Sequence, residues 1–157
     1  MIKNLLIIAH TPSENTKALA KALESGARHQ DIDHVNTRLC SPFDCNAEAV
    51  LNSDGIILFT TENFGYMSGA LKDFFERIYY PCLDQSKLND GKPFALVIRA
   101  GLDGTGTDIA VHKITTGLKW KEVQPLTLCK GDFDDAFIAQ CENLGLTFAA
   151  GLDNNIF

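Results

Sequence analysis

Short apolar runs alternate along the chain with segments whose apolar residues recur at helical spacing. The runs predict strands, because buried strands of a parallel sheet are nearly continuous in apolar residues. We expect strands at residues 3–10, 35–40, 55–60, 94–98 and 125–129, and the half-polar run at 35–40 suits a sheet edge. The segments between them predict helices that pack one face on a core.

The most regular helical pattern begins at Ser68, whose side chain is expected to cap the first turn. Its apolar stripe consists of Leu71, Phe74, Phe75, Ile78 and Tyr79. On the opposite face, the pairs Lys72/Glu76 and Asp73/Arg77 have opposite charges at the i,i+4 spacing. This combination predicts a surface helix with one buried side.

Strand and helix alternate five times within 157 residues. That order predicts an α/β protein with right-handed crossovers, and specifically a flavodoxin-like three-layer α/β/α sandwich. We expect a five-stranded parallel sheet in the order 2-1-3-4-5. The length suits one domain and the chain shows no linker or repeat, so residues 1–157 are expected to fold as a single domain.

Charge and composition exclude several classes of function. The net charge of −6 disfavours nucleic-acid binding and provides no polybasic membrane patch. No apolar run is long enough to span a bilayer. We therefore expect no nucleic-acid or membrane partner, and the cysteine pattern favours a cytoplasmic protein. The four histidines are not spaced as metal ligands, which predicts no metal site, and the five cysteines form no C-x-x-C pair, which predicts reduced thiols.

The loops after the first, third and fourth strands should meet at one edge of such a sheet, where open α/β folds bind ligands. The first loop offers Thr11, Ser13, Asn15 and Thr16. Hydroxyls, an amide and free N–H groups at a helix N-terminus are typical of a phosphate site. A helix cap explains Ser13 and Thr16 equally well, and both interpretations stay open. The loop contains neither G-K-[ST] nor G-x-G-x-x-G, which disfavours nucleotide hydrolysis and dinucleotide binding there.

The other two loops complete a possible site for a flat ligand. Phe64 and Tyr66 offer apolar surfaces, and Glu62 and Asn63 offer polar groups. The glycine-rich segment 101–107 can bring backbone amides close to a planar ligand. The three loops together offer a phosphate site, aromatic side chains for stacking and backbone amides for hydrogen bonding. This combination suits flavin mononucleotide, FMN. Alternatively, the aromatic residues cover the core and the glycine-rich segment is a flexible connection.

Three stretches carry a family resemblance. T-P-S-E-N-T-K-A-L-A at 11–20 resembles the first loop and helix of the NADPH-dependent FMN reductase and flavodoxin superfamily, where S-P…N-T-x-x-L-A recurs. T-E-N-F-G-Y-M-S-G-A-L-K at 61–72 resembles P-E-Y-N-G…G-x-L-K of FMN reductases. It is also similar to P-T-R-F-G-x-M-S-G-Q of the tryptophan-repressor-binding-protein group of NAD(P)H:quinone oxidoreductases. E-N-L-G-L-T-F-A-A-G-L at 142–152 resembles the last helix of that group.

The resemblance implies an FMN site built by all three loops. The implied cofactor-binding residues are Thr11, Ser13, Asn15, Thr16, Thr61, Glu62, Asn63, Phe64, Gly65, Gly101, Leu102, Asp103 and Gly104. The phosphate would lie at the first loop, the ring against residues 62–65, and its pyrimidine edge near residues 101–104. Glu14 stands where flavodoxins often have glycine, and Thr61 replaces the usual proline.

The implied function is an NAD(P)H-dependent oxidoreductase that passes hydride from NADPH or NADH through FMN to a quinone, a free flavin or a similar small acceptor. The third loop contains no aromatic residue, so one flavin face should be open to such a partner. Two alternatives remain: a flavodoxin-type one-electron carrier, and a flavodoxin-fold binding module that has lost FMN. His10 and Tyr66 are candidate proton donors near the ring, and a homodimer or homotetramer is compatible with the resemblance.

Overall fold

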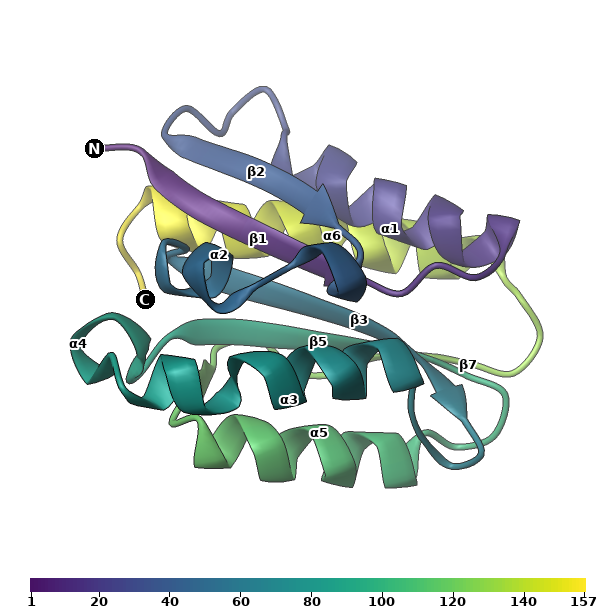
Figure 1. Cartoon of the computed structure of the whole chain (residues 1–157). Coiled ribbons are helices and arrows are strands. Elements are labelled where there is room, and N and C mark those ends of the chain that lie inside the picture. The colour runs from purple at the N-terminus through teal and green to yellow at the C-terminus, as the bar shows by residue number, and fades with distance from the viewer.

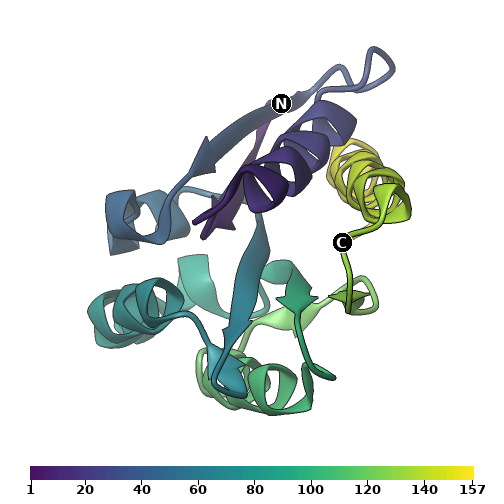
Figure 2. The same cartoon turned by 90° about the vertical axis from the view of Figure 1, so that its right-hand side faces the viewer.

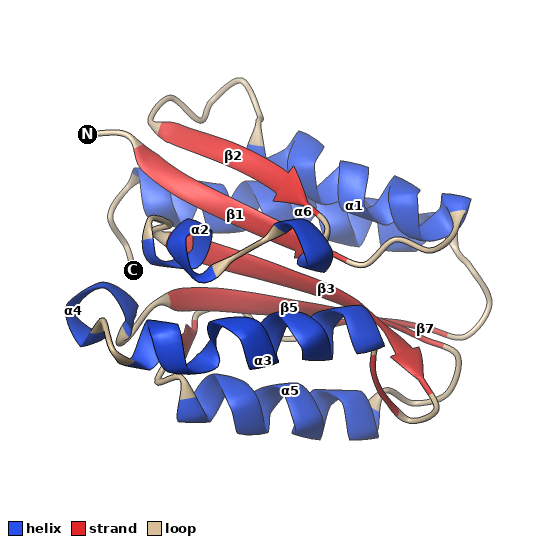
Figure 3. Cartoon of the chain, in the orientation of Figure 1, coloured by secondary structure: helices blue, strands red, loops and turns tan.

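The computed structural model describes residues 1–157, whose strands form one sheet between two layers of helices (Figures 1 and 3). The main sheet runs in the order β2-β1-β3-β5-β6, and β7 also pairs with β5. All of these pairings are parallel, which confirms the predicted flavodoxin-like fold. The strands are β1 (Lys3–Ala9), β2 (Val35–Cys40), β3 (Gly55–Asn63), β4 (Tyr66–Met67), β5 (Pro93–Ala100), β6 (Lys121–Glu122) and β7 (Thr127–Lys130).

Helices cover both faces of the sheet (Figure 2). One layer consists of α1 (Glu14–Ala27) and α6 (Asp135–Asp153). The other contains α2 (Ala47–Leu51), α3 (Gly69–Leu83) and α5 (Thr105–Gly117), with the short α4 (Ser86–Asn89) and the 3-10 turn η1 (Pro42–Asp44). None of these helices combines the length and the apolar character that crossing a membrane requires.

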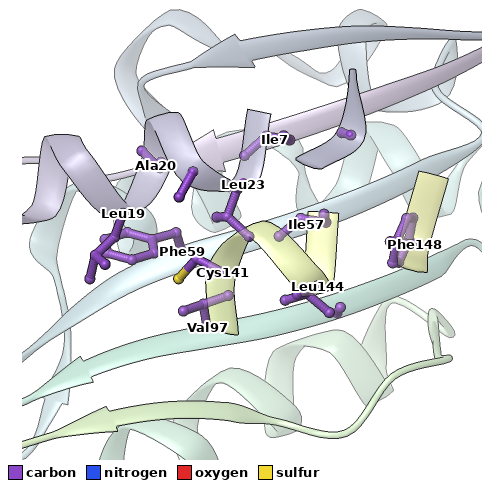
Figure 4. Packing of buried hydrophobic residues seen from close by; sticks show 14 of the residues in the cluster. Ile7, Leu19, Ala20, Leu23, Ile57, Phe59, Val97, Cys141, Leu144 and Phe148 are labelled. Carbon is purple, nitrogen blue, oxygen red and sulfur yellow. The ribbon is translucent and has the colours of Figure 1, made fainter. Parts of the chain in front are cut away.

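Alternate residues of the central strands point into two separate apolar layers. Ile7 and Ile57 pack with α1 and α6 (Figure 4), whereas Ile8 and Leu58 pack on the side of α3 and α5. All four are fully buried. Burial of each such side chain contributes roughly 1.5–3 kcal/mol, and burial on both faces explains why these strands are continuously apolar.

Helices α1 and α6 approach each other at two glycines. A Cβ atom added to Gly26 would lie 1.9 Å from the carbonyl oxygen of Glu142, and one added to Gly145 would lie 2.0 Å from the carbonyl oxygen of Leu23. Both distances are far shorter than any real contact. The helices therefore touch backbone to backbone, and no larger residue fits at either position without moving them apart.

The last strand differs from the single continuous strand expected at 125–129. It consists of two pieces, β6 and β7, separated by residues 123–126. Pro125 has no backbone N–H to donate to the ladder, which is why the proline segment interrupts the strand rather than beginning it. A second difference is β4, which pairs antiparallel with the end of β3.

The prediction that all cysteines are reduced thiols is wrong for Cys40 and Cys45, which form a disulfide. β2 ends at Cys40, and the η1 turn brings the chain back so that their Cα atoms lie 6.7 Å apart. Arg77 of α3 holds this turn by donating to the carbonyl oxygens of Pro42 and Cys45, each at 2.7 Å. The three free cysteines, all buried, are Cys82, Cys129 and Cys141.

His112 connects α5 to β6. Its Nε2 lies 2.7 Å from Glu122 Oε2, and its Nδ1 lies 2.9 Å from the carbonyl oxygen of Asp108. Burial of the ring disfavours its charged form, but the hydrogen bonds to Glu122 and Asp108 and their negative charges outweigh that effect. The pKa of His112 is therefore raised above its ordinary value of 6.5.

We expect Gly145→Ala to lower the free energy of unfolding by about 1–3 kcal/mol, the usual cost of overpacking a tight contact. Gly69→Ala is the matched control, because nothing lies within 4 Å of its added Cβ and alanine favours helices over glycine. Urea denaturation of both variants measures the difference. Equal stability of Gly145→Ala and the wild type would contradict the backbone contact between α1 and α6.

We also expect the stabilisation from His112 to depend on pH. Because its folded pKa is raised, this stabilisation is complete below the unfolded pKa of 6.5 and is lost as the pH rises through the higher folded value. The free energy of unfolding of the wild type, relative to His112→Asn, should therefore decrease across that window. Urea denaturation at a series of pH values measures it, and a constant difference would refute the charged link.

Candidate functional site

Three loops meet at the edge of the sheet where β1, β3 and β5 end, which is the edge that faces the viewer in Figure 2. We call residues 10–15 the first loop, 61–67 the second loop and 101–104 the third loop. β1, β3 and β5 are neighbours in parallel register, with Ala9 beside Phe59 and Thr61 beside Arg99. The predicted meeting of the three loops is therefore present.

In the first loop, Ser13 and Thr16 form a reciprocal cap on α1. Ser13 Oγ accepts the Thr16 amide at 3.2 Å, and Thr16 Oγ1 accepts the Ser13 amide at 3.0 Å. Both hydroxyls therefore take part in a helix cap, as the capping interpretation expects. The amides of Thr11, Glu14 and Asn15 donate no hydrogen bond within the protein. They leave free donors at the positive end of the helix dipole, an arrangement that binds anions.

The Glu14 carboxylate does not occupy these amides. Its side chain is 91% exposed and lies 3.2 Å from Lys17 Nζ. The carboxylate therefore points into solvent, where a surface ion pair contributes at most about 1 kcal/mol. Glu14 leaves the space in front of the first loop open, although its negative charge remains near it.

The second loop turns β3 back into β4 at Phe64 and Gly65. Their φ angles are +54° and +72°, as a tight two-residue hairpin turn requires. Glycine adopts this conformation freely, but for phenylalanine it costs roughly 1–2 kcal/mol. The Phe64 side chain is nevertheless fully exposed. The suggestion that it covers the core is therefore wrong, and the Phe64 ring is open to solvent.

The hairpin rests firmly on the N-terminus of α5. Thr107 Oγ1 donates to the carbonyl oxygen of Tyr66 at 3.0 Å. A Cβ atom added to Gly106 would lie 2.0 Å from the carbonyl oxygen of Gly65, so the two backbones are in direct contact. These contacts hold the exposed Phe64 ring on a rigid support.

Thr61 and Asn63 interact at the base of the hairpin. Thr61 Oγ1 donates to Asn63 Oδ1 at 3.0 Å, so the Asn63 side-chain amide nitrogen keeps its two hydrogens for another acceptor. Thr61 is buried, whereas Asn63 is partly exposed. Of this pair, Asn63 is the residue that can reach a ligand.

The third loop is bonded to the second by Glu62. One carboxylate oxygen of Glu62 accepts the Leu102 amide at 2.8 Å, and the other accepts the Gly104 amide at 2.7 Å. The amides of Gly101 and Asp103 donate no hydrogen bond to any other residue. Sequence reasoning missed this contact, because the two partners are separated by 40 and 42 residues and no motif marks the pair.

Asp103 is bonded to the first residue of α5, since its Oδ1 accepts the Thr105 amide at 3.0 Å. That hydrogen bond favours the charged carboxylate, so the pKa of Asp103 lies below its ordinary value. Two carboxylates, Glu62 and Asp103, thus neutralise the helix N-terminus at this loop. An anion would find little attraction there, which leaves the first loop as the better anion site.

The two candidate proton donors lie at the same edge but differ in suitability. Burial lowers the pKa of His10 below 6.5. The neutral form of the His10 ring is therefore favoured, which makes His10 a poor proton donor. Tyr66 is 41% exposed beside Phe64, and its hydroxyl donates no hydrogen bond within the protein. Tyr66 is accordingly the more accessible of the two.

Comparison with known proteins indicates the family of this chain. Residues 2–130 match the model of the family described as NADPH-dependent FMN reductase. A flavodoxin from Aquifex aeolicus (strain VF5) is 29% identical over 114 residues, which are 73% of this chain. The match spans only 59% of the length of that relative.

Solved structures show the same fold. An archaeal flavodoxin superimposes with a TM-score of 0.78 at 18% identity, over 95% of this chain and 98% of that one. A flavodoxin described as a WrbA-like protein from Agrobacterium tumefaciens gives 0.74 at 16% identity, over 99% of both chains. At such low identity these structures support the fold alone. The family model, however, matches residues 2–130, which are most of this chain. The flavodoxin-like chain therefore belongs to the NADPH-dependent FMN reductase family.

Proposed function

We propose that the three loops bind FMN and that the protein is an NAD(P)H-dependent oxidoreductase. The observation that carries this proposal is the exposed Phe64 ring, held in a strained turn at the same sheet edge as the free amides of the first loop. A flat apolar group and an anion site on one edge suit a ligand with an aromatic ring at one end and a phosphate at the other. Membership of the family supports FMN as that ligand.

The phosphate would lie at the first loop. The donors are the free amides of Thr11, Glu14 and Asn15, together with the Asn15 side chain. The hydroxyls of Ser13 and Thr16 are used in the helix cap, so their role would be to shape the loop rather than to bind the phosphate. This division of roles refines the residue set that the family resemblance implies.

The flavin ring would lie against the second and third loops. Phe64 would provide the stacking surface, and the Asn63 side-chain amide would provide a directed donor. The free amides of Gly101 and Asp103 would serve the polar edge of the ring. Gly65 and Thr61 would contribute the geometry of the turn rather than ligand contacts.

A reductase is favoured over a carrier because the third loop has no aromatic side chain to cover the second face of the ring. Bound FMN supplies two-electron chemistry between a nicotinamide and an acceptor. The residues of this chain would orient the ring and leave one face accessible to NADPH or NADH, and then to a small acceptor such as a quinone or a free flavin. A one-electron carrier is the second candidate, and it is favoured by the likeness to a protein named flavodoxin.

We expect the purified protein to bind FMN more tightly than riboflavin, which has the same ring but no phosphate. The phosphate would gain charge-assisted hydrogen bonds from free amides, each worth roughly 1.5–3 kcal/mol, so the affinity ratio should be at least about tenfold. Fluorescence titration measures both affinities. Equal affinities would contradict the phosphate site. In a separate step, addition of NADPH to the FMN complex should bleach the flavin if the protein is a reductase.

We expect Phe64→Ala to weaken FMN and riboflavin binding equally, by about tenfold, because a stacking contact of this kind contributes about 1–3 kcal/mol. Tyr80→Ala is the matched control, since it removes an exposed ring from the outer face of α3 and should leave both affinities unchanged. The same titration measures the effect. Unchanged binding by Phe64→Ala would show that the ring of Phe64 does not contact the flavin.

A further inference from the structure

One side of β7 is an unpaired edge of the sheet, because β7 pairs only with β5. The Gly131 amide donates to the carbonyl oxygen of Ala100 at the end of β5. Backbone N–H and C=O groups of successive strand residues point in alternate directions. Those of Leu128, three residues before Gly131, therefore point away from β5. The Leu126 amide also donates no backbone hydrogen bond, so this edge offers unused backbone groups to an added strand.

A hollow of about 560 Å³ lies along this edge, between residues 124–128 and α6. None of its nine lining residues is charged. The polar ones are Gln124, Thr127, Gln140, Asn143 and Thr147. None of these five side chains makes a hydrogen bond within the protein. The hollow can therefore bond to uncharged polar groups, but it offers no partner for a buried charge.

The two faces of β7 differ in chemistry. Cys129 belongs to the apolar layer beneath α1 and α6, whereas Leu126 and Leu128 pack on the side of α3 and α5. A strand added beside β7 would continue both faces, because side chains alternate between them. Every second side chain would lie over the polar groups of α6, and the others would lie beside the two leucines. An extended segment with alternating uncharged polar and apolar residues fits this arrangement.

The free part of the edge has defined ends. Pro125 and Lys130 stand on either side of residues 126–129, and both residue types discourage strand pairing. An added strand is thereby limited to the segment between them. At the opposite edge of the sheet, the Arg28 side chain already donates to the carbonyl oxygen of Thr37 in β2. The β7 edge has no such cover.

We propose that the β7 edge binds an extended segment of a partner protein, which adds to the sheet as a further strand. The segment has alternating apolar and uncharged polar side chains. A second copy of this chain fits less well, because each copy carries a net charge of −6 and the two would repel each other. The inference does not rest on FMN binding, since the hollow lies outside the three loops.

The test uses a hexapeptide of alternating valine and threonine with both ends blocked, and isothermal titration calorimetry measures its affinity. Two further peptides carry N-methyl groups, one on every valine and the other on every threonine. In a strand, the amides of only one of these sets face β7. We therefore expect one methylated peptide to bind about tenfold more weakly, through loss of backbone hydrogen bonds, and the other to bind like the unmodified peptide.

Leu128→Pro removes the outward N–H, and Leu128→Ala is the matched control, because it also removes the leucine side chain but keeps the N–H. We expect Leu128→Pro to bind the unmodified peptide about tenfold more weakly than Leu128→Ala. The peptide comparison needs only the wild type, so it decides the question even if Leu128→Pro does not fold.

Equal binding of all three peptides, no binding at millimolar peptide, or equal binding by the two Leu128 variants would overturn the proposal. Analytical ultracentrifugation of the protein alone tests the other occupant. Self-association of the wild type and of Leu128→Ala, abolished in Leu128→Pro, would show that the edge pairs with a second copy and would also contradict the proposal.

Discussion

The parallel register of β1, β3 and β5 is the constraint on which the site depends. Because these strands are neighbours and run in the same direction, the segments that follow them emerge at one edge, although they are far apart along the chain. The register is held by apolar packing on both faces, with Ile7 and Ile57 on one side and Ile8 and Leu58 on the other. A shift by one residue would exchange these two sets, so the core also determines the position of the loops.

Local chemistry made much of the fold predictable. The cap at Ser68 and the ion pairs Lys72/Glu76 and Asp73/Arg77 are present as expected, because each depends only on residues three or four positions apart. The buried strands were evident because burial on both faces requires apolar residues at every position. The meeting of the three loops then followed from the handedness of the crossovers, which is nearly invariant.

The features that escaped prediction depend on tertiary contacts. The sequence could not show whether Ser13 serves a cap or a ligand, since both uses need the same hydroxyl. The Cys40–Cys45 disulfide required knowledge of how η1 turns, and the bonds from Glu62 to the third loop required the paired ends of β3 and β5. The disulfide and the Glu62 bonds are created by the way the chain folds, so no spacing in the sequence reveals them.

The resulting site is divided between a first loop with free amides and a second loop with an exposed ring, and the third loop is held by a carboxylate. The most direct test is to record amide chemical shifts during an FMN titration. The proposed site predicts that the largest changes cluster at Thr11, Glu14, Asn15, Phe64, Gly101 and Asp103. Changes concentrated elsewhere, or none at saturating FMN, would contradict the assignment of this edge as the flavin site.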